Sequence, residues 1–342
     1  MSGPIRVLVV EDSVLMIHVI TEMLNSDSRL QVVDSARNGK EGIEKVISFD
    51  PDVVTLDMEM PVMDGTEFLK NIMNVHPVPV VMLSAYTKEG ARETIEALKL
   101  GAVDFVAKPS GSISLTIRDM KKELIEKIVL ASGIKRERLQ SAPQCELYPQ
   151  AYIPSNQTTR VVTICSSTGG PRALCAILSA LPKNLNACIL IIQHMPGEFT
   201  SLLAERLDRL SPLEVTEARG GEPIHKGKVY VAPGGKHLEV TDEGKITLTD
   251  KPKKHSVRPS CEVTLKSLAF FGERLLAIIL TGMGRDGSGG LCSVKERNGR
   301  VIVEDRSTSV IFGMPKAAIK TGYVDKIVPL HDIAKEVVDF AR

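Results

Sequence analysis

The sequence predicts an α/β protein of two domains, each built on a parallel sheet. The chain has 342 residues, which is long enough for two domains. Strand-like runs of β-branched residues alternate with runs of helical periodicity along most of the chain. The alternation stops over residues 140–159, where three prolines and few charges indicate a linker between domains. We place the domains at 1–130 and 160–342, with the linker over 131–159.

The first series predicts a doubly wound, five-stranded parallel sheet with helices on both faces. The expected strands are 6–10, 31–36, 53–57, 78–84 and 104–107, and the expected helices are 14–25, 39–49, 66–75, 90–100 and 114–135. Right-handed crossovers place the carboxyl ends of all these strands on one edge of the sheet.

The second series predicts a mostly parallel α/β domain with a small antiparallel portion. The expected strands are 160–165, 187–193, 275–281 and 300–304, and the expected helices are 171–181, 200–210, 263–271 and 332–341. Three short segments, 228–231, 238–240 and 245–249, adjoin glycine-containing turns and are expected to pair antiparallel.

Composition excludes several classes of protein. The chain has 43 Lys and Arg against 42 Asp and Glu, which argues against a nucleic-acid binder. Residues 1–109 hold 10 basic and 17 acidic residues, so the remainder carries a net charge of +8. Apolar stretches are of strand length, and the apolar run at the N-terminus is too short for a signal peptide, so we expect no membrane insertion. Six scattered cysteines without a C-x-x-C pair favour a reduced, cytoplasmic protein without zinc.

Chemically active residues follow the strands of the first series. Glu11 and Asp12 end the first strand, Asp57 the third, Ser84 the fourth and Lys108 the fifth. Carboxylates gathered at one edge favour Mg²⁺, while a hydroxyl and an ammonium suit a phosphoryl group. One such acid alone would more often cap a helix. The set together predicts phosphoryl transfer onto Asp57.

Residues 1 to about 130 resemble the receiver domain of two-component response regulators, which has a flavodoxin-like fold. The strings VLVVEDS, VTLDMEMPVMDG, VVMLSAY and AVDFVAKP carry this resemblance. It implies that a chemotaxis histidine kinase phosphorylates Asp57 and that Ser84 and Lys108 contact the phosphoryl group. The residues that it assigns to Mg²⁺ are Glu11, Asp12, Asp57 and, through its carbonyl, Glu59. Phe105 stands at the family's switch aromatic, which is often Tyr.

The turn after the first strand of the second series predicts a serine nucleophile. Ser167 lies in SSTGGP, between a strand and a helix, where glycines allow close approach of the backbone to a substrate. Free N–H groups at the start of the helix can stabilise an oxyanion, although such a turn could instead cradle a phosphate. The turn lacks the Gly-Lys-Ser/Thr ending of nucleotide-binding loops.

A serine nucleophile needs a base and an acid that orients the base. His194 directly follows the next strand and fits best as the base; the histidines that fit less well are His225, His237 and His255. Asp286, in a glycine-rich loop after another strand, is favoured as the acid, and Glu304 and Asp305 are its competitors.

Two other readings of the second domain are weaker. Gly282, Gly284 and Gly287 form a G-x-G-x-x-G after a strand, with Glu304 about 20 residues later, as in dinucleotide-binding domains. Too few residues follow for that fold, and it leaves Ser167 unexplained. A helix-turn-helix output module would need a basic recognition helix after the linker, and none is expected.

Residues 160–342 resemble the Rossmann-like catalytic domain of chemotaxis protein-glutamate methylesterases. The strings SSTGGP, QHMPGEFTSLLAERL, YVAPGGKH, RPSCEV, ILTGMGRDG and IFGMP carry the resemblance. It implies that Ser167 is the nucleophile, His194 the base and Asp286 the orienting acid. The backbone amides assigned to the oxyanion hole are those of Thr168 and Met283. Cys165 stands where the family usually has Gly, which would strain the turn if this position needs a positive φ.

Together, the two resemblances imply a phosphorylation-activated hydrolase. It would demethylate glutamate methyl esters on methyl-accepting chemotaxis receptors, and deamidation of receptor glutamines would be a closely related reaction. The unphosphorylated receiver would cover the serine site. We expect a monomer with Mg²⁺ in the receiver domain and no cofactor in the esterase domain.

Overall fold

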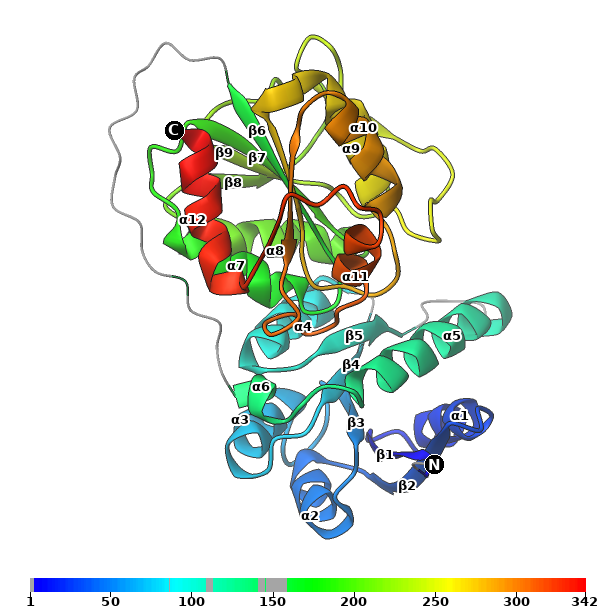
Figure 1. The fold of residues 1–342 in the computed structure, drawn as a ribbon. Helices are drawn as coiled ribbons and strands as arrows, with labels where there is room; N and C mark the ends of the chain where they lie inside the picture. Colours follow the sequence, from blue (N-terminus) through cyan, green and yellow to red (C-terminus); the bar gives the residue numbers. More distant parts are fainter. Residues whose placement is uncertain (1–2, 86, 109–112, 141–144, 146–158) are drawn as a thin grey trace. The chain divides into compact units, whose positions relative to one another are not determined.

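The computed structural model describes residues 3–85, 87–108, 113–140, 145 and 159–342. Residue 86, Pro109 and most of the predicted linker lie outside these residues. The chain forms two compact units, Met1–Ala142 and Pro143–Arg342 (Figure 1). In the described ranges, no helix is long and apolar enough to cross a membrane.

The first unit contains the predicted five-stranded sheet, in the order β2-β1-β3-β4-β5 with all neighbours parallel. Its strands are β1 (Ile5–Val10), β2 (Leu30–Ala36), β3 (Val53–Asp57), β4 (Val80–Ser84) and β5 (Asp104–Ala107). Its helices are α1 (Val14–Asn25), α2 (Gly39–Phe49), α3 (Gly65–Val75), α4 (Lys88–Leu100), α5 (Ile113–Ala131) and α6 (Glu137–Gln140). Asn38 and Asp64 begin α2 and α3 by accepting hydrogen bonds from backbone amides.

Residues 131–140, predicted as linker, belong to the first unit in the structure. After α5 ends, Arg136 donates a 2.7 Å hydrogen bond to Asp50 Oδ1 at the end of α2. Arg136 also lies 3.0 Å from His76 Nε2, at the end of α3. These contacts explain why the compact unit extends through α6. Sequence periodicity carries no signal for such contacts, because their partners lie 60 and 86 residues away in the chain.

The second unit is built on a seven-stranded sheet in the order β14-β13-β12-β6-β7-β9-β8, and every neighbouring pair is parallel. The strands are β6 (Arg160–Ser166), β7 (Ala187–Gln193), β8 (Glu214–Glu217), β9 (Lys228–Val231), β12 (Leu275–Ile279), β13 (Arg300–Glu304) and β14 (Lys326–Val328). Its α-helices are α7 (Gly170–Ala180), α8 (Gly197–Leu210), α9 (Cys261–Leu268), α10 (Leu291–Glu296), α11 (Met314–Ile319) and α12 (Leu330–Ala341).

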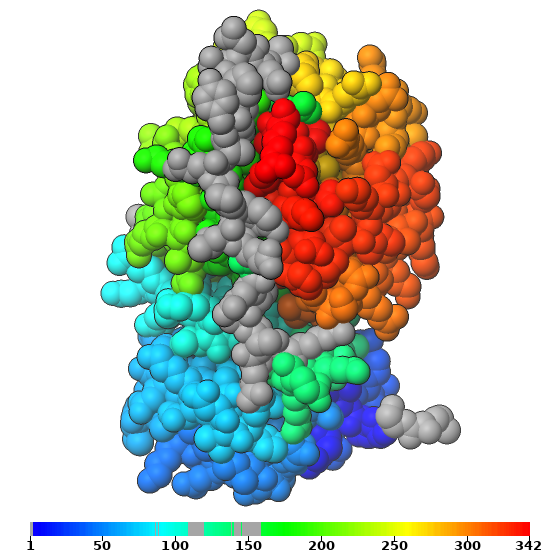
Figure 2. All heavy atoms as spheres, turned by 60° about the vertical axis from the view of Figure 1, so that its left-hand side comes forward, coloured from blue at the N-terminus to red at the C-terminus, as the bar shows by residue number. Residues whose placement is uncertain are grey.

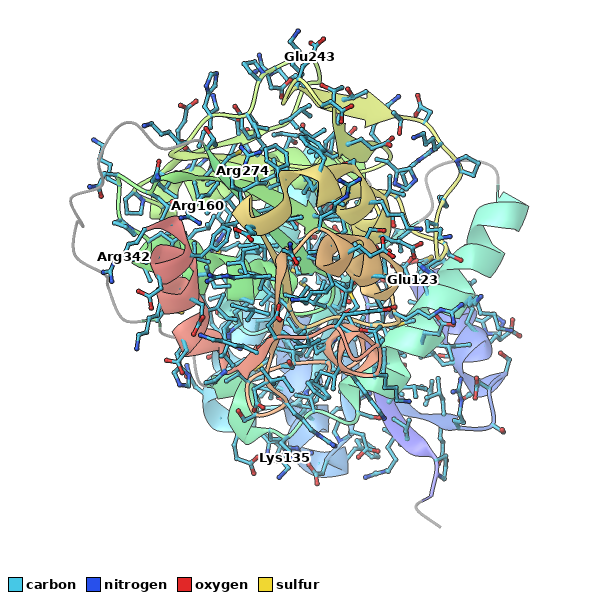
Figure 3. The ribbon with its side chains drawn as sticks, turned by 45° about the horizontal axis from the view of Figure 1, so that its top comes forward. Glu123, Lys135, Arg160, Glu243, Arg274 and Arg342 are labelled. Atoms are coloured by element: carbon cyan, nitrogen blue, oxygen red, sulfur yellow. The ribbon has the colours of Figure 1, made fainter. Side chains whose placement is uncertain are left out.

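The small antiparallel portion is a separate two-stranded sheet of β10 (His237–Val240) and β11 (Ile246–Thr249). Glu243 lies in the turn between its strands (Figure 3). The antiparallel prediction was wrong for β9, which is a parallel strand between β7 and β8. Three of its four residues are buried in the main sheet, and burial on both faces is typical of parallel strands.

Helices cover both faces of the large sheet (Figure 1): α7, α8 and α12 lie on one face, and α9, α10 and α11 on the other. The closing helix α12 forms part of the molecular surface (Figure 2). Arg160, which is labelled in Figure 3, lies at the start of β6. Its guanidinium is 5.3 Å from the ring centre of Phe340 in α12. The chain runs from β6 to strands on one side and then to strands on the other, so the order of the sheet reverses at β6. Ligand sites in open α/β sheets lie at such reversals, outside the carboxyl ends of the strands.

Candidate active site and phosphorylation site

Three carboxylates gather at the carboxyl edge of the first sheet. Ligand oxygens of Glu11, Asp12 and Asp57 lie within 4.8 Å of one another. Lys108 Nζ lies between two of them, 2.9 Å from Glu11 Oε2 and 2.9 Å from Asp57 Oδ2. The structure thus brings together four of the residues that the sequence predicts at this edge.

The charge of this cluster suits a divalent cation. Burial, with the nearby Asp57 carboxylate, raises the pKa of Glu11 to about 7, against the opposing effect of Lys108. Burial would lower the pKa of Lys108, but its hydrogen bonds to Asp57 and Glu11 raise it. A crowded set of oxygen ligands carrying more negative than positive charge is the kind of site that Mg²⁺ prefers.

The other residues predicted for this site lie around the cluster. Ser84 ends β4, and its hydroxyl donates to the Gly90 carbonyl (3.0 Å) and accepts from Thr94 Oγ1 (2.7 Å). The Ser84 carbonyl accepts a hydrogen bond from the Lys108 N–H (2.7 Å), which joins the ends of β4 and β5. Glu59 follows Asp57 by two residues and its side chain is exposed. Phe105 is buried.

In the second unit, Ser167 lies in the turn that joins β6 to α7. Its N–H donates to the Thr281 carbonyl (3.0 Å), and its own carbonyl accepts from the Gly170 N–H (2.8 Å). Gly169 has a φ of 80°, a conformation that glycine adopts without strain. The tight turn leaves Ser167 half-buried above the sheet, while the last six residues of β6 before it are buried.

His194 and Asp286 form a buried hydrogen-bonded pair. The distance from His194 Nε2 to Asp286 Oδ2 is 2.8 Å, and the two side chains are 9% and 2% exposed. His194 directly follows β7, and its N–H donates to the Ser166 carbonyl (3.0 Å). Because Nε2 faces the carboxylate, Nδ1 is the ring nitrogen left for a second partner.

The Asp286 carboxylate also caps α9. It accepts hydrogen bonds from the Ser260 hydroxyl (2.7 Å), the Cys261 N–H (2.6 Å) and the Glu262 N–H (3.2 Å). Burial would raise the pKa of Asp286, but the hydrogen bonds from His194, Ser260 and Cys261 hold it well below its usual range. The carboxylate is therefore ionised and fixed, as an acid that orients an imidazole must be.

Gln193, which the sequence analysis did not single out, connects the serine and histidine segments. Its Oε1 accepts from Ser166 Oγ (2.7 Å), and its Nε2 donates to the carbonyls of Ser167 (3.0 Å) and His194 (3.1 Å). The side chain is only 2% exposed. The sequence does contain one indication of this role, because Gln193 is the polar residue that ends the otherwise apolar strand ACILIIQ.

The two competing acids lie elsewhere. Glu304 accepts hydrogen bonds from the Thr281 N–H (2.7 Å) and Thr308 Oγ1 (3.0 Å), and Asp305 accepts from the Ser307 N–H (2.7 Å). Asp286 holds the contact to His194 because the loop after β12 turns back toward α9. The alternatives Glu304 and Asp305 therefore do not fit as the partner of His194.

Glu304 supplies a test by pH. Burial raises its pKa to about 7 in the folded protein, against an ordinary value of 4.5. Because the folded protein favours the protonated form of Glu304, this group stabilises the fold at low pH. The stabilisation is lost as the pH rises from about 4.5 through 7. The shift corresponds to about 3 kcal/mol. We expect Glu304→Gln to remove this loss, measured as the change in thermal unfolding midpoint between pH 5 and pH 8. An equal change in both proteins would contradict the assignment.

The glycine-rich loop after β12 makes room for the serine turn. A methyl group on Gly282 would lie 2.8 Å from Ser167 Cβ and 2.5 Å from Met314 Sδ, both too close. This glycine therefore allows close packing of Ser167, which accounts for part of the G-x-G-x-x-G pattern without a dinucleotide. Thr168 directly follows Ser167, and Met283 directly follows Gly282. The amides of Thr168 and Met283 therefore belong to neighbouring segments. Thr281 Oγ1 joins these segments by donating to the Thr168 carbonyl (2.9 Å).

Cys165 fits its position without strain. It is a regular residue of β6, paired with Ile192 of β7 and Ile279 of β12, and it is not among the residues with positive φ. Its side chain is fully buried. Two of the three less favoured histidines have other partners: His237 accepts from the Ser260 N–H (3.2 Å), and His255 pairs with Glu262 (2.9 Å).

Comparison with known proteins agrees with this architecture. The family model described as CheB methylesterase matches residues 162–337, and the response regulator receiver domain model matches residues 7–118. Two relatives, from Pyrococcus abyssi and Geobacillus kaustophilus, are named protein-glutamate methylesterase/protein-glutamine glutaminase. The first is 47% identical over 98% of this chain and 93% of its own length; the second is 48% identical over 98% of each.

A solved structure gives the same result for the second unit. The Thermotoga maritima CheB methylesterase catalytic domain is 44% identical and superposes with a TM-score of 0.52. It covers 54% of this chain and 99% of that one. From these matches and the two sheets, the chain belongs to the CheB methylesterase family, as a response regulator in which a receiver domain precedes a methylesterase domain.

Proposed function

We propose that Ser167, His194 and Asp286 hydrolyse glutamate methyl esters on chemotaxis receptors, under control of phosphorylation at Asp57. The observation that carries this proposal is the buried His194–Asp286 pair beside the serine turn, at the carboxyl ends of β6, β7 and β12. A histidine held by a buried carboxylate beside a serine is typical of a serine hydrolase, although Asp286 contacts Nε2 here, whereas in the usual triad the carboxylate contacts Nδ1.

In the proposed mechanism, each of these groups has one step. Ser167 Oγ attacks the ester carbonyl, and its proton passes to His194 Nδ1, while Nε2–H remains bonded to Asp286. The N–H groups of Thr168 and Met283 donate to the oxyanion. Methanol leaves with the proton from His194, and water then attacks the acyl-serine and releases the glutamate carboxylate. With a glutamine side chain, ammonia would leave in place of methanol, the second activity in the relatives' names.

In the receiver domain, Asp57 takes the phosphoryl group from a phosphohistidine of a kinase. An Asp57 oxygen bonds to phosphorus as the N–P bond breaks, and the kinase histidine recovers a proton. Glu11, Asp12, Asp57 and the Glu59 carbonyl would hold Mg²⁺, which shares the charge of the transferred group when bound. Lys108 supplies a second positive charge 2.9 Å from Asp57. Ser84 would contact the phosphoryl group after its hydroxyl turns away from Gly90.

The test is methanol release from methylated receptor membranes, measured for the full chain with and without a small phosphodonor and Mg²⁺. We expect the phosphodonor to raise the rate at least severalfold and Asp57→Asn to remove that increase. Asp52→Asn, at an exposed position, is the matched control and should respond like the wild type. An increase that survives Asp57→Asn would contradict the proposed control.

A further inference from the structure

Two buried thiols lie beside the His194–Asp286 pair. Cys261 begins α9, and its Sγ is 3.7 Å from His194 Nε2. Cys165, near the end of β6, interacts through its side chain with the Cys261 thiol. Both cysteines are fully buried. Two sulfurs, an imidazole nitrogen and a carboxylate oxygen therefore converge at one point of the second unit.

The spacing of these atoms suits a metal ion. The ligand atoms of His194, Cys261 and Asp286 all lie within 4.8 Å of one another. Tetrahedral zinc, with Zn–S of about 2.3 Å and Zn–N of about 2.0 Å, separates its sulfur and nitrogen ligands by roughly 3.5 Å. The observed separation of 3.7 Å is close to this value. The 2.8 Å between His194 Nε2 and Asp286 Oδ2 would open by several tenths of an ångström.

The donor set selects a different ion from that of the receiver domain. Thiolate sulfur and imidazole nitrogen favour zinc and softer ions, whereas the carboxylates around Asp57 favour Mg²⁺. We propose that His194, Cys261 and Asp286, with Cys165 as a fourth donor, bind a thiophilic divalent cation such as Zn²⁺ or Cd²⁺. The bound ion inhibits ester hydrolysis.

The mode of inhibition follows from the proton balance and rests on the proposed function. The ion bonds to the Nε2 lone pair, so the imidazole proton moves to Nδ1. The Cys261 and Cys165 thiols each release one proton to the buffer as the ion binds, and both bind as thiolates. Nδ1 then carries a proton and cannot accept one from Ser167. The ion therefore turns the imidazole into the tautomer that is inactive as a base.

The experiment is a Cd²⁺ titration of the full chain in excess Mg²⁺, which occupies the oxygen ligands of the receiver domain. Two quantities are measured in parallel: the ultraviolet absorption of the Cd²⁺–thiolate bond and the rate of methanol release. For the wild type, we expect the absorption to appear as the rate falls at least tenfold, and EDTA followed by fresh Mg²⁺ to reverse both.

Cys261→Ser should weaken Cd²⁺ binding and inhibition at least tenfold, each rate being compared with that of the same variant without Cd²⁺. Cys292→Ser is the matched control, because its thiol also lies near a carboxylate, 3.3 Å from Glu296, but at a more exposed position on α10. It should behave as the wild type. If Cys261→Ser does not fold, Cys165→Ser tests the same site through the neighbouring sulfur.

The outcomes separate the metal site from the proposed function. Absorption and inhibition that persist in Cys261→Ser would overturn the metal site. Absorption that depends on Cys261, with an unchanged rate at saturating Cd²⁺, would overturn the inhibition and contradict the role of His194 as base. Loss of both the Cd²⁺–thiolate absorption and the inhibition in Cys261→Ser supports the proposal.

Discussion

Ser167→Ala is expected to abolish methanol release from methylated receptors, lowering the rate by roughly four to six orders of magnitude. The substitution removes the oxygen that would form the acyl intermediate in the proposed mechanism. The neighbouring Ser166 is fully buried, and its hydroxyl donates to Gln193. The measurement is methanol release at saturating phosphodonor, together with labelling of the protein by a serine-directed phosphonate.

Two controls make this result specific. Ser179→Ala, on α7, removes a hydroxyl that donates to the Ala176 carbonyl (3.1 Å) within the same helix, and it should keep both activity and labelling. The Ser167 variant should still be phosphorylated at Asp57, which shows that the receiver domain is intact. Methanol release that persists in Ser167→Ala would rule out this serine as the nucleophile.

Asp286→Asn is expected to lower the rate by about 10³- to 10⁴-fold, because an amide cannot hold the imidazole in the active tautomer or stabilise its charged form. The same change weakens the cap of α9, since the side chain keeps only one of two acceptor oxygens. We expect a loss of about 1–3 kcal/mol in the stability of the second unit. Rates should therefore be measured where circular dichroism shows the variant to be folded.

Asp305→Asn is the matched control, since it also removes a charge from an acid that follows a strand. Asp305 caps a turn through Ser307 and should lose less than tenfold in rate. Equal losses in the two variants would contradict the choice of Asp286. The lowered pKa of Asp286 also makes stability depend on pH. The ionised Asp286 stabilises the folded protein above the ordinary carboxyl pKa, and this stabilisation is lost as the pH falls below that value.

The predicted fold followed from alternation, and most strands and helices are close to the predicted ranges. The strands that were missed or wrongly paired have physical explanations. β14 has two exposed residues among its three and no apolar run to reveal it, and β8 has only four residues. The sequence of β9 is typical of a short alternating strand. Its parallel direction depends on its pairing with β7 and β8, which local sequence does not reveal.

The candidate site was predictable where residues end strands, because parallel strands carry their ends to one edge. Ser167 and His194 directly follow β6 and β7, and Asp286 lies in the loop after β12. The supporting residues were not predictable. Gln193 depends on the register between β6 and β7, and Cys261 lies beside His194 only because α9 packs where the loop after β12 ends. Such contacts join segments about 27 to 67 residues apart, and local sequence carries no record of them.

The reversal of the sheet at β6 sets an order of assembly for the active site. β6 and β7 are separated by only one helix, so the segments carrying Ser167 and His194 can pair early during synthesis. The other edge of β6 is covered only when β12 pairs with it, and the paired residues Val161 and Leu275 lie more than a hundred residues apart in the chain. Pairings of such long range are slow, and an uncovered strand edge is prone to aggregation. The nascent chain therefore holds Ser167 and His194, the proposed nucleophile and base, for some time before Asp286, the proposed orienting acid, is synthesised. The proposed triad is therefore complete only after β12 and the loop that follows it have joined the sheet.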